Sequence, residues 1–156
     1  MAIKPGDKAP LFKLWSSDKQ EVSLSDLAGK NVVLLFFPQA FTRVCTAELC
    51  STRDGLSDYQ NLNAQPLAIS VDSVATLNRF KEDQQLNFPL LSDFNKEVSR
   101  AYDAIYEEFG FGMKGVSKRA AFLIDKNGII RYAEVLENAG GLPNFDALRA
   151  TLENLN

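Results

Sequence analysis

The sequence contains no histidine and only two cysteines and one tryptophan among its 156 residues. Without histidine, Ser-His-Asp triads, Cys-His nucleophile pairs and zinc sites with imidazole ligands are excluded. Two cysteines are too few for a four-thiolate structural site, and the carboxylates show no metal-ligand spacing. We therefore expect no bound metal.

Long apolar runs and an excess of positive charge are also missing. No apolar run approaches the roughly 18 residues of a membrane-spanning helix, and residues 1–7 lack the apolar segment of a secretion signal. The formal net charge is -3, and the lysines and arginines are scattered. These features predict a cytoplasmic protein that binds neither membranes nor nucleic acids.

The remaining composition is that of an ordinary globular protein, with 46% hydrophobic and 24% charged residues. A chain of this length can bury a substantial core in one domain. We expect a single domain spanning residues 1–156.

The apolar pattern predicts alternating strands and helices. The uninterrupted run at 31–37 is typical of a strand buried on both faces. Further strands are expected at 11–15, 21–24, 66–71, 88–93, 120–124 and 129–135. Helices are expected at 45–62, 96–102 and 143–155, and another is expected to begin at a cap formed by 72–73 and to include Phe80. A helical turn is expected at 25–29, capped by Ser25 and Asp26. This order predicts an α/β fold whose N-terminal hairpin lies at the sheet edge.

One glycine pattern needs separate treatment, because 110–115 matches the dinucleotide-binding form GxGxxG. That fingerprint requires a strand before it and a helix after it. Here no strand pattern precedes it and the strand at 120–124 follows. We interpret this segment as a flexible surface loop.

The two cysteines, Cys45 and Cys50, fall in one stretch just after the buried strand. Cys45 is expected at the start of a helix, where main-chain amides favour an anion. This position therefore favours thiolate over thiol and indicates a reactive cysteine.

The pattern Pro38-x-x-x-Thr42-x-x-Cys45 resembles the active-site signature Pro-x-x-x-Thr/Ser-x-x-Cys of the peroxiredoxins, the alkyl hydroperoxide reductase and thiol-specific antioxidant family. The resemblance extends over essentially the whole chain, including the opening at 4–10 and Arg119 ahead of 122–128. It implies a thioredoxin-like fold, with a central mixed sheet flanked by helices, and a thiol peroxidase activity.

The resemblance also implies roles for individual residues. Cys45 would attack one oxygen of a hydroperoxide and become a sulfenic acid. Thr42 would place its hydroxyl between thiolate and peroxide, and Pro38 would shield the thiolate from water. Arg119 would supply positive charge beside the sulfur, and the amides of Val44 and Cys45 would stabilise charge on the leaving oxygen.

Glu48 lies one helical turn after Cys45, on the same face of the expected helix. It could orient an arginine through a bidentate ion pair. An exposed helix carboxylate with no such role is the alternative interpretation.

The role of Cys50 has two interpretations. Its spacing from Cys45 resembles the resolving cysteine of Q-type peroxiredoxins, the bacterioferritin-comigratory proteins, which form an intrachain disulfide. The sequence of residues 36–42 more closely resembles the E-type alkyl hydroperoxide reductases, several of which use a single cysteine. In that interpretation Cys50 would be structural. Five residues of helix separate the Cα atoms by roughly 8 to 9 Å, beyond the roughly 7 Å limit of a disulfide. Resolution by Cys50 therefore requires the first turns of the helix to unwind.

The sequence thus predicts a cofactor-free peroxidase for hydrogen peroxide and small organic hydroperoxides, recycled by a thioredoxin-like or low-molecular-weight thiol. Apolar loop residues such as Phe41, Phe109 and Phe111 would serve a homodimer contact or a substrate collar. A peroxide-sensing switch protein that signals through the same Cys45 without turnover is the competing hypothesis.

Overall fold

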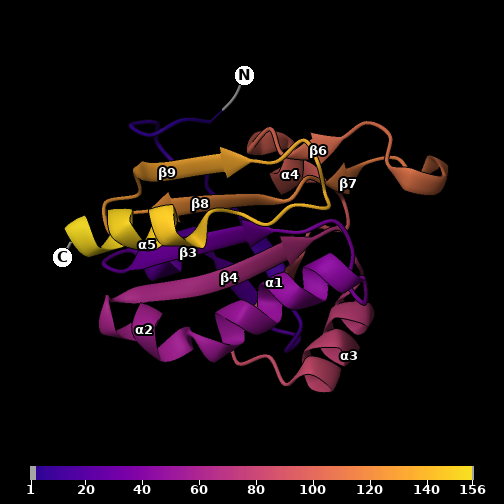
Figure 1. The fold of residues 1–156 in the computed structure, drawn as a ribbon, viewed down its shortest axis with the longest axis horizontal. Helices are drawn as coiled ribbons and strands as arrows, with labels where there is room; N and C mark the ends of the chain where they lie inside the picture. The colour runs from indigo at the N-terminus through magenta and orange to yellow at the C-terminus, as the bar shows by residue number, and fades with distance from the viewer. Residues whose placement is uncertain (1–2, 156) are drawn as a thin grey trace.

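The computed structural model describes residues 3–155, which form a seven-stranded mixed sheet covered on both faces (Figure 1). The sheet has the order β2-β1-β5-β4-β3-β8-β9. Its strands are β1 (Lys13–Ser16), β2 (Glu21–Ser23), β3 (Asn31–Phe36), β4 (Ala64–Ser70), β5 (Leu90–Ser92), β8 (Ala120–Ile124) and β9 (Ile130–Val135). The three strands β3, β4 and β5 are parallel, and the others pair antiparallel.

Helices connect these strands and cover the sheet. They are η1 (Leu24–Leu27), α1 (Arg43–Asp54), α2 (Leu56–Asn61), α3 (Val74–Gln84), α4 (Glu97–Ala101), η2 (Gly110–Gly112) and α5 (Phe145–Asn154). Side-chain caps begin two of them, because Ser73 accepts from the amide of Thr76 and Asn144 from that of Ala147. Within residues 3–155, no helix is long and apolar enough to cross a membrane.

The central strand β3 divides the core into two halves, as its uninterrupted apolar run predicts. Val33 and Leu35 face one cluster, which contains Cys45 and residues of α3 and α5, while Val32 and Leu34 face the other. Every residue of β3 is buried. Burial on both faces fixes the strand, and with it the loop that follows.

The pairing of β3 with β8 determines which residues meet beyond the end of β3. Phe36 pairs with Ala120 in this antiparallel ladder. The residue before Ala120 is Arg119, and the residue after Phe36 is Phe37. The chain therefore brings Arg119 to the sheet end where the loop towards Cys45 begins.

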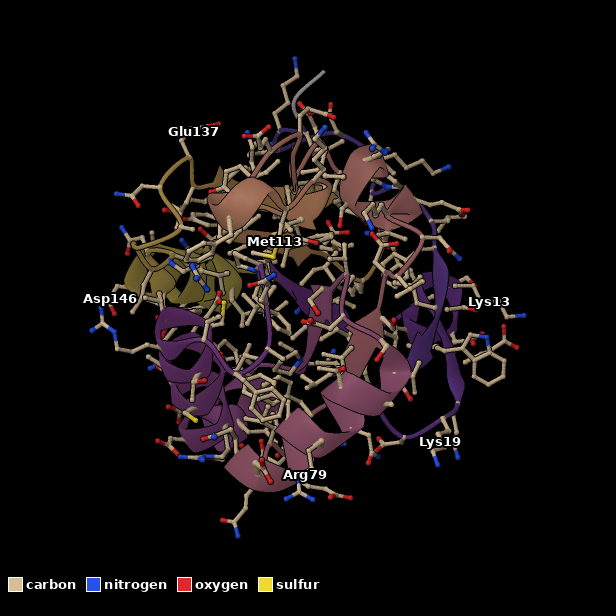
Figure 2. All side chains as sticks on the ribbon, turned by 90° about the vertical axis from the view of Figure 1, so that its right-hand side faces the viewer. Lys13, Lys19, Arg79, Met113, Glu137 and Asp146 are labelled. Carbon is tan, nitrogen blue, oxygen red and sulfur yellow. The ribbon has the colours of Figure 1, made fainter. Side chains whose placement is uncertain are left out.

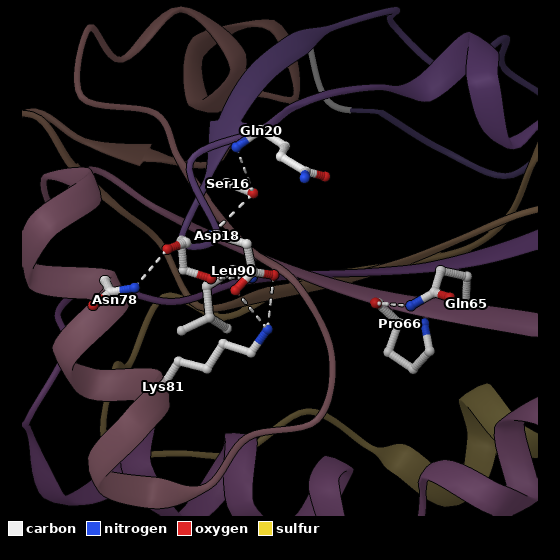
Figure 3. A network of polar contacts seen from close by, with 9 residues as sticks. Ser16, Asp18, Gln20, Gln65, Pro66, Asn78, Lys81 and Leu90 are labelled. Carbon is white, nitrogen blue, oxygen red and sulfur yellow. Dashed lines mark hydrogen bonds and ion pairs between the residues drawn. The ribbon is translucent and has the colours of Figure 1, made fainter.

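The predicted N-terminal hairpin lies at the sheet edge and is attached to α3 through its turn (Figure 3). Nζ of Lys81 is 3.2 and 2.9 Å from the two carboxylate oxygens of Asp18. Nδ2 of Asn78 donates to the main-chain oxygen of Ser17 at 2.9 Å. These contacts join the edge hairpin to the layer of helices.

Several predicted boundaries are wrong. The helix expected at 45–62 begins at Arg43 and is interrupted at Gly55, so two helices replace one. The helical turn expected at 25–29 is a 3₁₀ helix over 24–27, and neither Ser25 nor Asp26 caps it, because Ser23 occupies the cap position. Asp72 does not cap α3, since Ser73 does.

The segment with the GxGxxG pattern lies in a loop between two short strands that the apolar pattern does not predict. These are β6 (Ile105–Tyr106) and β7 (Val116–Ser117), which pair antiparallel. The loop extends from one end of the molecule (Figure 1). Phe111 in this loop is fully exposed, which agrees with the predicted surface loop.

Candidate active site

The loop from Pro38 to Thr42 places Cys45 in the first turn of α1. Pro38 is buried. The amide of Ala40 donates to Oδ2 of Asp72 at 2.8 Å, and this hydrogen bond helps to fix the loop. Phe41 adopts a left-handed conformation with φ of 67°. Such a backbone is unusual for an aromatic residue, so it needs support from the surrounding contacts.

Cys45 is the third residue of α1 and its side chain is buried, with 1% exposed. Nη2 of Arg119 lies 3.2 Å from Sγ of Cys45 and donates to it. The amides of the first helical turn have no carbonyl partner within the helix, and they carry partial positive charge. A guanidinium and a helix N-terminus thus both favour a thiolate at this sulfur.

Arg119 is almost completely buried and its donors are divided among three groups. Nη1 donates to Oε1 of Glu48 at 2.8 Å, and Nη2 donates to Sγ of Cys45. Nε and Nη2 both donate to the main-chain oxygen of Ala139, at 3.2 and 2.9 Å. Burial alone would lower the pKa of Arg119, but the negative charges and hydrogen bonds of Glu48 and Cys45 raise it. The guanidinium therefore remains protonated.

Glu48 is fully buried, so the interpretation as an exposed carboxylate is wrong. The predicted bidentate pair is also wrong, because the other donors of Arg119 bind Cys45 and Ala139. Oε2 of Glu48 has no hydrogen-bond partner among residues 3–155. Burial raises the pKa of Glu48 to about 7, although the charge of Arg119 and its hydrogen bond act in the opposite direction.

Thr42 is the residue before α1, and its side chain is exposed. Its hydroxyl donates to the main-chain oxygen of Gln39 at 2.8 Å rather than capping the helix. The hydroxyl oxygen retains lone pairs that can accept a hydrogen bond. The proton of Thr42 is thus committed within the loop, while its oxygen is available to a bound molecule.

Cys50 lies further along the same helix and is half-buried. Both cysteines are free thiols. Because α1 is continuous from Arg43 to Asp54, the two Cα atoms have the helical separation of roughly 8 to 9 Å. A disulfide between them therefore requires a change in this helix.

Three parts of the site could not be predicted from sequence patterns. The oxygen of Ala139 is a main-chain group, which leaves no signal in the side-chain pattern. Asp72 supports the loop at Ala40 but resembles an ordinary helix cap in the sequence. Met113, labelled in Figure 2, accepts from Nε2 of Gln39 at 2.9 Å and so connects the exposed loop 107–115 to the loop beside Pro38.

The described side chains around the site do not form a set of metal ligands. Over residues 3–155, no group of three or more Cys, Asp or Glu side chains is placed to hold a metal ion. The chemistry of the site lies in one thiol, one guanidinium and one buried carboxyl.

A mixed sheet with a buried helix-terminal cysteine beside an arginine defines a thioredoxin-like protein built for thiol chemistry. Residues 5–133 match the AhpC/TSA family model. The chain belongs to this family, and it is a thiol-dependent peroxidase of the peroxiredoxin type.

Individual relatives show how similar the chain is to known members. Alkyl hydroperoxide reductase E of Mycobacterium tuberculosis is 41% identical over 136 residues, which cover 85% of this chain and 86% of the relative. Peroxiredoxin Bcp of Escherichia coli is 36% identical over 132 residues, or 83% and 84% of the two chains. The crystal structure of peroxidoxin BcpB from Mycobacterium tuberculosis superimposes with a TM-score of 0.87 at 29% identity, over 99% of both chains. The chain is thus similar both to an alkyl hydroperoxide reductase E and to a Bcp peroxiredoxin.

Proposed function

We propose that Cys45 is the nucleophile that reduces hydrogen peroxide and small organic hydroperoxides. The observation that carries this proposal is the 3.2 Å contact between Nη2 of Arg119 and Sγ of Cys45, two side chains that are both buried. A fixed positive charge favours the thiolate, which is the reactive form of cysteine. The names of the relatives, alkyl hydroperoxide reductase E and peroxiredoxin Bcp, support the same substrate class.

The reaction is a displacement on oxygen. The Cys45 thiolate attacks the terminal oxygen of the hydroperoxide, an S–O bond forms and the O–O bond breaks. The leaving alkoxide or hydroxide takes up a proton and departs as alcohol or water. Cys45 is oxidised to a sulfenic acid while the peroxide is reduced by two electrons.

Arg119 and the first amides of α1 stabilise the charge that moves from sulfur to oxygen. Arg119 is held from two sides, by Glu48 and by the oxygen of Ala139, so it needs no rearrangement during the reaction. Thr42 accepts a hydrogen bond from the hydroperoxide through its free lone pairs, and Pro38 keeps water from the sulfur. Because a hydroperoxide is small and neutral, its orientation matters more than the strength of its binding.

Cys50 then resolves the sulfenic acid by forming a disulfide with Cys45. This step requires the first turns of α1 to unwind, since the helical separation exceeds the reach of a disulfide. A thioredoxin-like donor reduces the disulfide and returns both thiols. In the alternative single-cysteine mechanism, an external thiol attacks the sulfenic acid directly and Cys50 only packs against its neighbours.

We further propose that a single domain over residues 1–156 carries out the reaction in the cytoplasm. The reducing conditions there maintain Cys45 and Cys50 as thiols. Phe41, with 51% of its side chain exposed, and the fully exposed Phe111 support self-association into a homodimer. Sedimentation of wild type against Phe41→Ser tests this contact, and an unchanged monomer in both would refute it.

Steady-state turnover distinguishes this function from a peroxide sensor. With excess thioredoxin or dithiothreitol, we expect wild type to consume many equivalents of hydrogen peroxide and Cys45→Ser to consume none. Consumption that stops after about one equivalent would identify a sensor, and turnover by Cys45→Ser would refute the assignment of the nucleophile.

A further inference from the structure

Cys50 and Arg53 meet at the same residue of the neighbouring helix. Sγ of Cys50 is 3.5 Å from Oε1 of Gln84, the last residue of α3. Arg53 follows Cys50 by three positions, so both side chains lie on one side of α1. Nη1 of Arg53 donates to the main-chain oxygen of Gln84 at 2.6 Å. The end of α3 thus receives both side chains.

Arg53 is held by further contacts, although 29% of its side chain is exposed. Its Nε donates to Oδ1 of Asp54 at 2.9 Å. Its own main-chain oxygen accepts from Nδ2 of Asn87 at 3.3 Å. These contacts fasten the last turn of α1 to the region after α3, so the guanidinium is a fixed charge rather than a freely moving one.

We propose that Arg53 is a positioning residue for Cys50: its guanidinium, held on the end of α3, stabilises the Cys50 thiolate and keeps it in place to attack oxidised Cys45. This inference rests on the proposed function, because it requires a sulfenic acid at Cys45. In the step, the Cys50 thiolate attacks Sγ of Cys45, the S–S bond forms as the S–O bond breaks, and hydroxide leaves. The hydroxide takes a proton from solvent and becomes water.

The charges around Cys50 support this assignment. The pKa of Arg53 is raised, first by its hydrogen bond with Asp54 and then, against the effect of burial, by the negative charges of Cys50 and Asp54. Arg53 therefore shares the contact residue Gln84 with Cys50 and interacts with the charge of Cys50.

Gln84 suits both protonation states of Cys50. Its amide oxygen accepts the hydrogen bond of the thiol, and the same amide group carries two N–H donors. Rotation of the amide would present a donor to the thiolate. Gln84 can therefore remain in contact with the sulfur when the proton leaves.

The position of Arg53 also defines which part of α1 has to move. Arg53 fastens the turn after Cys50, while the start of α1 has no side-chain cap from Thr42. A missing N-cap lowers the stability of a helix start by about 1 kcal/mol. Unwinding thus concerns residues 43–49, and Cys45 travels towards a stationary Cys50.

The test follows the two oxidation steps separately in the full-length chain. Fully reduced protein receives one equivalent of hydrogen peroxide, is quenched at set times, and is analysed by intact mass and free-thiol count between pH 6 and pH 9. The variants are Arg53→Met, Arg53→Gln and Arg53→Lys. Arg53→Gln keeps a donor for the oxygen of Gln84 without the charge, and it replaces Arg53→Met if that variant fails to fold. Arg79→Met is the matched control, because Arg79 points outward from α3 (Figure 2).

We expect the uncharged variants to form the disulfide about tenfold more slowly near pH 7, with the pH profile moved to higher pH, because the thiolate is the attacking form. Arg53→Lys should stay within about threefold of wild type, as expected when charge is the main contribution. Oxygen addition to Cys45 should proceed at the wild-type rate in all Arg53 variants. In Arg79→Met, both oxygen addition and disulfide formation should proceed at the wild-type rate.

Disulfide formation at the wild-type rate in Arg53→Gln, or a loss that is equal at every pH, would overturn the proposal. The two levels of inference fail differently. If wild-type Cys45 gains no oxygen, the proposed function is wrong. If Cys45 gains oxygen while Cys50 stays free, the peroxidase function stands and the role of Arg53 is refuted.

Discussion

Arg119 donates from one guanidinium to both Sγ of Cys45 and Oε1 of Glu48, at 3.2 and 2.8 Å. The antiparallel pairing of β3 with β8 makes this contact, although Arg119 and Cys45 are 74 positions apart in the chain. One cation thus faces two groups that can each carry a negative charge.

Arg119→Met should lower kcat/KM for hydrogen peroxide by about 100-fold to 1000-fold, as for loss of a fixed donor to developing charge. The variant also leaves Glu48 buried without its partner, which destabilises proteins by about 3 to 5 kcal/mol when the remaining group stays charged. Arg119→Met combined with Glu48→Gln removes that charge and serves as the control. If the double variant regains wild-type kcat/KM, Arg119 acts through folding alone and its catalytic role is refuted.

Glu48→Gln should change how stability depends on pH. The pKa of Glu48 rises from an ordinary value of 4.5 to about 7 in the folded protein. Between these values the folded state holds a proton that the unfolded state has released. Wild-type stability should therefore fall as pH rises from about 4.5 to about 7, by roughly 3 kcal/mol from this group, and then level off.

Urea unfolding at several pH values measures this effect as the difference between wild type and Glu48→Gln. The difference isolates one group, because all other titrating residues are shared by the two proteins. A difference that is constant from pH 4 to pH 8 would show that Glu48 titrates normally, and a difference with the opposite slope would show that Arg119 dominates over burial.

Ala47→Gly should accelerate disulfide formation between Cys45 and Cys50. Ala47 is exposed in the first half of α1, so its replacement removes helix propensity of about 1 kcal/mol without removing core contacts. If unwinding is an equilibrium that precedes the attack by Cys50, the rate should rise about fivefold, because 1.4 kcal/mol corresponds to about tenfold in an equilibrium constant. Ala150→Gly, an exposed position in α5, is the matched control. An unchanged rate in Ala47→Gly, measured by quenched thiol counting, would contradict an unwinding of this helix before the attack.

The sequence was informative where one residue type decides the structure or the chemistry. The apolar run of β3, the presence of the last helix and the position of Cys45 near a helix start all follow from local patterns, and the structure agrees. The signature around Cys45 also identified the family before any fold was known.

The contacts of the site were less predictable, because they depend on how residues far apart in the sequence come together. The donors of Arg119 are divided among Cys45, Glu48 and the oxygen of Ala139, which a helical spacing rule cannot show. The same rule placed Glu48 on the correct face but could not give its complete burial. The break at Gly55 and the short pair of β6 and β7 were missed because their apolar signals are weak.

The most direct test of the central claim is the intact mass of Cys50→Ser after one equivalent of hydrogen peroxide. This variant leaves Cys45 as the one cysteine of the chain. We predict that the protein gains one oxygen atom, loses its free thiol and reacts with a sulfenic-acid trap such as dimedone. An unchanged mass with the Cys45 thiol still free and the peroxide unconsumed would contradict the account.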